Sequence, residues 1–314
     1  MSANKVFSIP SKQKGVALIM LVLVLVIASA ATFLSSFGGN NLKIERDKKT
    51  ALALTEAKSA LIGWSASHST MPGILPCPED VSLIGTPNEG VAKTSCTGPS
   101  LGRLPWKTLG FGDLRDGNGD KLWYVISNGF RSSPINLNSQ AQLTVDGQQG
   151  AAVAIIFSSG PPLHNQIRSP INLANPAHYL DLVNANGGNA FLSKGLPAVF
   201  NDQLKIVTKN DLFKTIKFRI LGEIRGDSSQ GLKQYFLLNQ SVYSYADINL
   251  DGKSDAGQLI GTPSYNGDQS SLFFSSQKKS MLVNNGWMNL TQYSMSYDRK
   301  RVTLLLGDQS MIVE

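Results

Sequence analysis

The feature that most constrains this chain is an uninterrupted apolar run near its N-terminus. Residues 16–34 read VALIMLVLVLVIASAATFL and carry no charge, with Ser29 and Thr32 as their polar members. A helix rises about 1.5 Å per residue, so a run of this length can just cross a hydrocarbon core about 30 Å thick. We therefore expect a membrane-spanning helix over residues 16–37, followed by a large separate body.

Three ways of processing this run are compatible with the residues around it. It can remain as an uncleaved anchor, or it can act as a secretory signal peptide cut after the small-residue site Ala28-Ser29-Ala30. The third follows from a resemblance: Lys14-Gly15 ahead of a long aliphatic run resembles the leader of type IV prepilins, which are cut after the glycine. Because the apolar character continues past residue 30, the sequence favours cleavage between Gly15 and Val16.

The prepilin resemblance implies a location and a set of partners. Mature subunits of this class carry an N-methylated first residue, which would be Val16. Their apolar helix rests in the bacterial inner membrane, with the N-terminus cytoplasmic and the body periplasmic, until it packs into a filament core. The implied partners are a prepilin peptidase, the inner membrane and other pilin or pseudopilin subunits.

One residue departs from the pattern of the repeating subunits. The family usually places a glutamate at the fifth mature position, and counting from Val16 that position holds Met20. Minor pilins and the tip pseudopilin of type II secretion systems also tend to lack the glutamate. The resemblance therefore implies a minor subunit, at the tip of a filament or within it.

The charge distribution argues against a nucleic-acid partner. The formal net charge is +7, but Lys5, Lys12 and Lys14 belong to the expected leader, so the processed chain would carry +4. The least dispersed basic group, over residues 43–49, is interrupted by Glu45 and Asp47. Such a mixture is typical of a solvated helix face rather than of a nucleic-acid site.

The two cysteines, Cys77 and Cys96, lie close together in the sequence. In a reducing compartment they would be two free thiols, whereas in an oxidising compartment a loop of this length favours a disulfide. A metal site would need further ligands, and the chain has only three histidines, at positions 68, 164 and 178. We expect a disulfide that contributes roughly 3 kcal/mol by restricting the unfolded chain.

Helical periodicity resumes after the apolar run. Leu54, Ala57, Leu61 and Trp64 recur at the spacing of one helix face, and Met71-Pro72-Gly73 marks the end of that helix. Two glycines and two asparagines over residues 38–41 predict a local interruption. The expected segments are a leader over 1–15, a spanning helix over 16–37, an amphipathic continuation over 38–68, an exported α+β domain with the disulfide loop over 69–226, and a β-rich subdomain over 227–314.

Four motifs carry a second resemblance, which covers roughly residues 12–225. They are AKSALIGW at 57–64, LPCP at 75–78, GRLPWKTLG at 102–110 and LRDGNGDKLWY at 114–124, and together they are similar to a group of exported prepilin-like proteins. The implied fold class is α+β, with a long N-terminal helix packed on an exported domain.

The pattern of the body is also mixed. The run KLWYVIS (121–127) predicts a strand whose β-branched and aromatic residues pack, and AAVAIIF (151–157) predicts a buried strand. Residues 158–208 are predicted to form long loops. Asn210 is placed to cap a helix with Phe213, Ile216 and Ile220 on its apolar face. Beyond residue 226, hairpin-type turns separate strand-like runs at 235–245, 271–276, 287–297, 302–306 and 310–314. This pattern predicts a C-terminal antiparallel meander.

The sharpest chemical motif runs from Asp247 to Asp255. The carboxylate and amide oxygens of Asp247, Asn249, Asp251 and Asp255, with the backbone carbonyl of Lys253, have the spacing of a calcium loop that resembles EF-hand and dockerin loops. The bidentate acid expected at the twelfth position is missing, so an acidic turn between strands is the alternative. We expect at most one structural Ca²⁺ here. For the similar set at residues 116, 118 and 120, a turn without metal is favoured, because a lysine follows where glycine belongs.

No enzyme motif is present in the sequence. The chain lacks a G-x-S-x-G elbow, an H-E-x-x-H pair, a P-loop and a dinucleotide fingerprint, so we expect no catalytic residues. The predicted function is structural: a minor pilin or pseudopilin of a type IV pilus or type II secretion-like filament. The alternative is an exported or tethered adhesin-like module whose C-terminal β region binds a ligand without forming a filament.

Overall fold

The computed structural model describes residues 14–265 and 272–314, with side chains from residue 19 onward except those of residues 30–40. The chain divides into two compact units, Met1–Lys49 and Thr50–Glu314, and each is considered by itself. Residues 1–13 of the expected leader lie outside the described residues.

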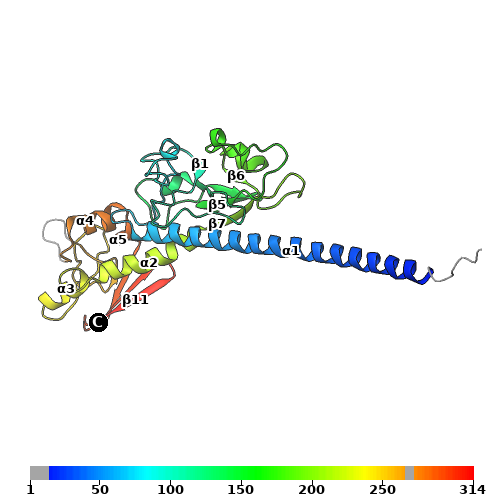
Figure 1. Ribbon diagram of the computed structural model, residues 1–314. Coiled ribbons are helices and arrows are strands. Elements are labelled where there is room, and N and C mark those ends of the chain that lie inside the picture. Colours follow the sequence, from blue (N-terminus) through cyan, green and yellow to red (C-terminus); the bar gives the residue numbers. More distant parts are fainter. Residues whose placement is uncertain (1–13, 266–271) are drawn as a thin grey trace, which may run out of the picture. The chain divides into compact units, whose positions relative to one another are not determined.

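The first helix, α1, runs from Lys14 to Ser67 over 54 residues (Figure 1). The interruption expected over residues 38–41 is absent, because the backbone there is helical like that on either side. A glycine costs a helix interior only about 1 kcal/mol relative to alanine. Such local costs are too small to end a helix that continues for several turns in both directions.

Within the described residues, none of the helices combines the length and the continuous apolar character that a membrane crossing requires. This finding contradicts the expected transmembrane helix over residues 16–37. It equally contradicts the expected single-pass location in the inner membrane, with a cytoplasmic N-terminus and a periplasmic body.

The fold is α+β, and its central sheet is antiparallel. The sheet has the order β1 (Ser100–Arg103), β2 (Trp123–Ile126), β5 (Ala154–Ser158) and β7 (Gln203–Val207). Strand β2 falls within the first predicted run, and β5 overlaps the second and ends one residue beyond it, at Ser158. All residues of both strands are buried. Both faces of the sheet are covered, which explains why these strands lack the alternation of a half-exposed strand.

The two faces of the central sheet belong to two different cores. Tyr124, Ile126 and Ile156 point into a large core that also contains apolar residues of α1 and of α2 (Lys209–Arg225). Their neighbours along the same strands, such as Trp123 and Phe157, point into a smaller core on the other face. Successive side chains of a strand point to opposite faces of the sheet, so neighbouring residues enter the two cores in turn.

The apolar faces predicted for both long helices are buried, except that Trp64 at the end of the α1 face is only partly buried. On α1 these positions include Leu54, Ala57 and Leu61, and on α2 they include Phe213 and Ile216. The start of α2 differs from the prediction, because Thr208 rather than Asn210 is the N-cap, in a capping box with the side chain of Asp211.

A second, three-stranded sheet supports the smaller core. It consists of β4 (Gln148–Ala152), β3 (Leu143–Val145) and β6 (Ala190–Phe191), with an antiparallel β3–β4 pair and a parallel β3–β6 pair. The surrounding segment is mostly loop, as predicted, with short 3-10 helices at Pro170–Asn172, Pro176–His178 and Leu182–Asn186. Two further 3-10 helices lie at Val81–Leu83 and Asn128–Phe130.

The C-terminal sheet is an antiparallel meander of β8 (Ile260–Gly261), β9 (Gln292–Met295), β10 (Val302–Leu306) and β11 (Gln309–Val313). The prediction of two further strands before this sheet is wrong for the described residues. The run at 235–245 begins with the C-terminal half of helix α3 (Gly231–Leu238), and the run at 271–276, described from residue 272 onward, leads into α4 (Ser276–Lys279). A π-helical turn, Ser280–Asn284, and helix α5, Trp287–Leu290, then precede β9.

Candidate functional site

The most unusual surface of the described chain is a stretch of α1 that we call the aliphatic segment, residues 19–27. Its nine consecutive side chains are all apolar, and each is at least half exposed, from 50% at Val22 to 66% at Ile19. Nine residues turn through more than two full turns of helix, so the apolar character covers every face. A helix that is hydrophobic all round is stable in water only when other structure surrounds it.

The predicted cleavage pair lies just before the aliphatic segment. Gly15 and Val16 have helical backbone in α1, and their side chains lie outside the described residues. Met20, which stands where repeating prepilin subunits have a glutamate, is 62% exposed within the segment. After the segment, residues 41–49 are exposed and mix Lys43 and Arg46 with acidic side chains, which fits a solvated helix face.

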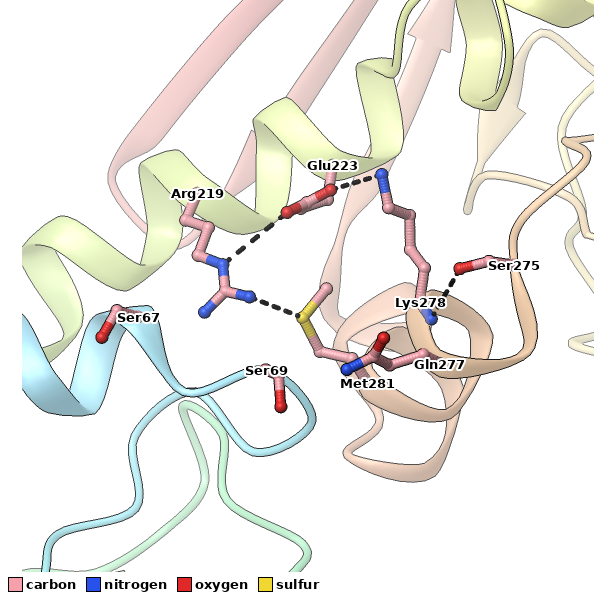
Figure 2. Close-up of a pocket in the computed structure, with 8 residues that line it drawn as sticks. All are labelled: Ser67, Ser69, Arg219, Glu223, Ser275, Gln277, Lys278 and Met281. Carbon is pink, nitrogen blue, oxygen red and sulfur yellow. Dashed lines mark hydrogen bonds and ion pairs between the residues drawn. The ribbon is translucent and has the colours of Figure 1, made fainter.

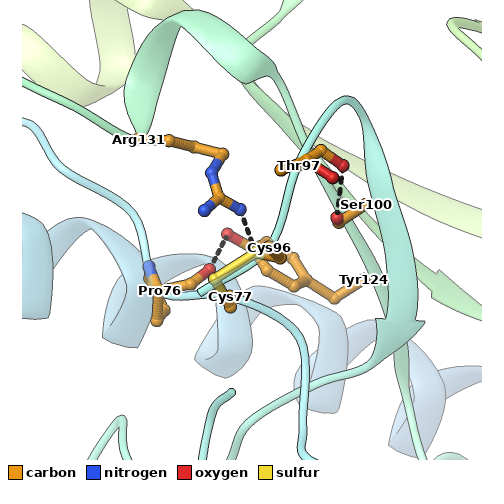
Figure 3. The surroundings of a disulfide bond; sticks show 7 residues. All are labelled: Pro76, Cys77, Cys96, Thr97, Ser100, Tyr124 and Arg131. Carbon is orange, nitrogen blue, oxygen red and sulfur yellow. Dashed lines mark hydrogen bonds between the residues drawn. A yellow bond between two sulfur atoms is a disulfide. The ribbon is translucent and has the colours of Figure 1, made fainter. Parts of the chain in front are cut away.

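Cys77 and Cys96 are joined by a disulfide bond, with 5.9 Å between their Cα atoms (Figure 3). The bond lies against the central sheet, where the buried hydroxyl of Tyr124 in β2 donates a hydrogen bond to the carbonyl of Pro76 at 3.1 Å. Burial raises the pKa of Tyr124, so this hydroxyl stays protonated. The guanidinium of Arg131 donates to the Sγ atom of Cys96. These contacts fix both ends of the loop that the disulfide closes.

The LPWKTLG motif packs against that same loop. A Cβ atom at Gly90 would lie only 2.3 Å from the ring of Trp106, so only glycine allows the loop to approach the indole. The backbone N–H of Gly90 donates to the carboxyl of Glu79 at 2.7 Å, and burial raises the pKa of Glu79. Lys121 lies 5.7 Å from the centre of the Trp106 ring and pairs with Glu89. The motif therefore has a structural role in holding the disulfide loop to the sheet.

The predicted calcium residues form a tight loop whose oxygens accept backbone hydrogen bonds. Asp247 is buried and accepts from the N–H groups of residues 250 and 252, at 2.7 and 2.9 Å. Asn249 accepts from the N–H of Asp251, and Asp251 accepts in turn from the N–H of Lys253. The carboxylate of Asp255 accepts from the N–H of residue 248 at 2.8 Å.

Within the described ranges, no three His, Cys, Asp or Glu side chains converge as a metal site would require. The same oxygens serve the turn in this arrangement, so calcium binding at the loop stays a prediction. The second acidic set contributes to a turn as well: buried Asp116 accepts from the N–H groups of Asn118 and Asp120 at 2.8 and 3.0 Å and from the hydroxyl of Ser158 at 2.6 Å.

A polar pocket of about 250 Å³ lies where the end of α1 meets α2 and α4 (Figure 2). Its charged groups are all engaged with one another. Arg219 donates to the carbonyl of His68 at 2.8 Å and lies 3.7 Å from Glu223, which also contacts Lys278 at 2.5 Å. The other lining residues are Ser67, Ser69, Ser275, Gln277 and Met281.

The contacts in this pocket have a structural role: they connect the end of α1 to α2 and α2 to α4. Burial, reinforced by the charge of Arg219, lowers the pKa of His68, whose Nδ1 atom accepts a hydrogen bond from the N–H of Met71 at 3.1 Å. The imidazole is therefore committed to the backbone turn after α1. No sequence motif predicted this group of charges. Arg219 and Glu223 lie on α2 and Lys278 lies on α4, and these helices meet only in the folded chain.

No protein-family model matches the chain, and no curated protein or solved structure shows significant similarity to it. The likeness to prepilins therefore rests on the motifs of the sequence.

Proposed function

We propose that this chain is a minor subunit of a type IV pilus or type II secretion-like filament, in which the aliphatic segment packs among the N-terminal helices of other subunits. The observation that carries the proposal is the nine-residue stretch of α1 whose apolar side chains are exposed on every face. Packing on one flat surface would leave most of these side chains in water. A bundle of helices from several subunits covers all of them.

The burial energy available to such packing is large. Complete burial of one aliphatic side chain contributes roughly 1.5–3 kcal/mol, so the nine residues together could contribute more than about 10 kcal/mol. The ordering cost of association reduces this figure, but the helix is already formed, so little additional backbone entropy is lost.

Met20 supports a minor rather than a repeating position. A buried glutamate at this point would need a positively charged partner from the neighbouring subunit. The thioether of Met20 makes no such demand and adapts to irregular apolar surroundings. A subunit of this kind can contact neighbours without the ion pair that orders a regular stack.

Site-specific photo-cross-linking in the cell of origin tests the proposal. A photoreactive residue at position 23, inside the aliphatic segment, should give a covalent product whose mapped peptide is the aliphatic N-terminal helix of another subunit. The matched control places the same residue at Ile171, an apolar side chain of the body that is 92% exposed. That position should give no such product. Cross-links from position 23 to no protein, or only to the body of its own chain, would refute filament packing.

The mass of the mature N-terminus provides an independent test. Processing as a prepilin leaves Val16, often N-methylated, as the first residue and retains the aliphatic segment. A first residue at Ala31 would remove the segment and favour the alternative of a secreted ligand-binding module. An intact Met1 would contradict prepilin processing.

A further inference from the structure

A second pocket, in the C-terminal half of the body, differs from the polar pocket in that apolar side chains form part of its lining. It lies between the end of α2, the turn at residues 226–228, helix α3, and the residue that follows β11. Helix α2 packs on both α3 and β11, so the walls belong to one packed region (Figure 1). Its volume of about 490 Å³ lies in the range of pockets that bind small molecules.

Two glycines shape one edge of this pocket. Gly226 ends α2 with a φ of 67° and a ψ of −157°, a conformation that is almost exclusive to glycine. A Cβ atom there would lie 1.9 Å from the carbonyl oxygen of Gln230, and one at Gly231 would lie 2.7 Å from the Cα atom of Gly226. The turn is closed by a 2.9 Å hydrogen bond from the N–H of Asp227 to Gln230. The backbone of the turn that contributes Gly226 and Asp227 to the lining is therefore fixed.

Tyr243 provides an unsatisfied polar group in the pocket lining. Its side chain is completely buried, and its ring lies 4.7 Å from that of Phe236, yet its hydroxyl has no hydrogen-bond partner among the described residues. The neighbouring Tyr293 is buried as deeply and donates to the carbonyl of Ser244 at 2.7 Å. A buried hydroxyl without a partner costs about 1–3 kcal/mol, so a bound acceptor would be favourable.

The hydroxyl of Tyr243 would act as a donor at neutral pH. Burial raises its pKa, and the carboxylate of Glu314 raises it further. The phenol therefore stays protonated and can donate to an acceptor in the pocket.

The uncommitted charge around the pocket is positive. Arg225 and Lys233 line it and make no hydrogen bond or ion pair with any residue of the described chain. The acidic residues of the lining are already occupied: Asp227 accepts from the N–H and hydroxyl of Ser229, and Glu314 pairs with Arg301 at 2.7 Å. Phe236 and Leu237 contribute apolar side chains to the lining, and Ser228 contributes a hydroxyl.

We propose that this pocket binds an aliphatic monocarboxylate. Its hydrocarbon tail lies on Phe236 and Leu237, and its carboxylate accepts from Arg225, Lys233 and the hydroxyl of Tyr243. The apolar side chains favour a hydrocarbon tail, and the two cations favour an anionic head group. The hydroxyl of Tyr243 gains the hydrogen-bond acceptor that it lacks among the described residues of the unliganded protein. Binding here is independent of filament assembly, since every residue involved lies in the unit Thr50–Glu314.

Titration calorimetry on the full chain tests the site with three probes: decanoate, decanol and acetate. Decanoate should bind saturably, decanol at least tenfold more weakly, and acetate without measurable heat. Tyr243→Phe removes only the hydroxyl and should weaken decanoate binding about fivefold, the equivalent of one ordinary hydrogen bond. The matched control, Tyr297→Phe at a side chain that is 93% exposed, should leave the affinity unchanged.

The cation contribution is tested separately. Arg225→Gln combined with Lys233→Gln should weaken decanoate binding at least tenfold, whereas Lys194→Gln combined with Lys300→Gln, at exposed positions outside the pocket, should not. Near-ultraviolet circular dichroism checks that each variant keeps the fold.

Three results would overturn the proposal. One is the absence of saturable decanoate binding, which would mean that water alone satisfies the phenol. Another is equal binding of decanol and decanoate. The third is unchanged affinity in both pocket variants, which would place the ligand on the aliphatic segment instead.

Discussion

Two buried carboxyl groups, Asp181 and Asp202, give the body a stability that should fall as the pH rises. Both residues are 4% exposed, and each carboxylate accepts a hydrogen bond from the backbone of the other segment. Asp202 accepts from the N–H of Asp181 and from the amide of Asn184, both at 2.9 Å. Asp181 accepts from the N–H groups of Asn201 and Asp202, at 2.7 and 3.1 Å.

Burial raises the pKa of Asp202 from 3.8 to about 7, and the nearby charge of Asp181 adds to the increase. Between about pH 4 and pH 7 the folded chain therefore keeps a proton on Asp202 that the unfolded chain has already released. Stability is greatest below the unfolded pKa and decreases as the pH rises through the folded pKa. About three pKa units correspond to at most about 4 kcal/mol, and the penalty is complete above pH 7.

Asp202→Asn removes the ionisation and keeps an oxygen that can accept the same two hydrogen bonds. The variant should match the wild type within about 1 kcal/mol at pH 4, and it should be more stable at pH 8 by up to about 4 kcal/mol. Glu56→Gln, the same chemical change on an exposed part of α1, should leave the pH dependence unchanged.

Urea unfolding of the full chain at pH values from 4 to 8 measures this difference. The comparison between variant and wild type cancels other titrating groups, including His68, whose pKa is lowered by burial and which therefore acts in the opposite direction. A difference in unfolding free energy that stays constant between pH 5 and pH 8, or that falls, would show that Asp202 is not held protonated.

Three further predictions concern the fold and the calcium loop. Replacing Cys77 and Cys96 by alanine should lower the unfolding free energy by about 3 kcal/mol, as expected for a 19-residue separation, and reduced wild type should unfold at the same urea concentration as the variant. Leu61→Ala in the large core should cost about 2–5 kcal/mol by urea unfolding, whereas Leu52→Ala on the exposed face of α1 should change stability by less than about 0.5 kcal/mol. Millimolar Ca²⁺ is expected to raise the melting temperature and Asp251→Ala to abolish that rise; an equal rise in both proteins would exclude the loop as the site.

The elements that the sequence predicts well are those with long, regular periodicity. The second half of α1 and all of α2 repeat their apolar residues at helical spacing, and Leu61 and Ile216 are buried as that spacing requires. The runs containing β2 and β5 are continuous and apolar because the sheet is covered on both sides. In each case one local pattern and the tertiary environment demand the same structure.

The prediction fails where composition and spacing disagree. The run from Tyr235 to Tyr245 is rich in aromatic residues, which favours a strand, yet Leu232, Tyr235 and Phe236 have the i, i+3, i+4 spacing of a helix and belong to α3. The N-cap of α2 lies two residues before the expected Asn210, because Thr208 and Asp211 form a reciprocal pair of hydrogen bonds.

The candidate sites also differ in whether the sequence alone can identify them. Cys77 and Cys96 are close in sequence, so local reasoning can pair them. Asp181 and Asp202 lie in loops without periodicity, and only the folded chain brings their carboxyl groups together. The pocket at Tyr243 likewise combines lining residues between 225 and 243 with Glu314, which is far from them in the sequence.

The composition of the aliphatic segment limits what it can specify in the proposed filament. Leucine at positions 21, 23 and 25 alternates with valine at 22, 24 and 26. A period of two on a helix of 3.6 residues per turn distributes both side-chain shapes around all faces, so no single seam is distinct from the others. Met20 adds no charge that could fix an alignment. The segment therefore supplies burial energy without a preferred register, and the position of this subunit among its neighbours must be set by contacts of residues outside it.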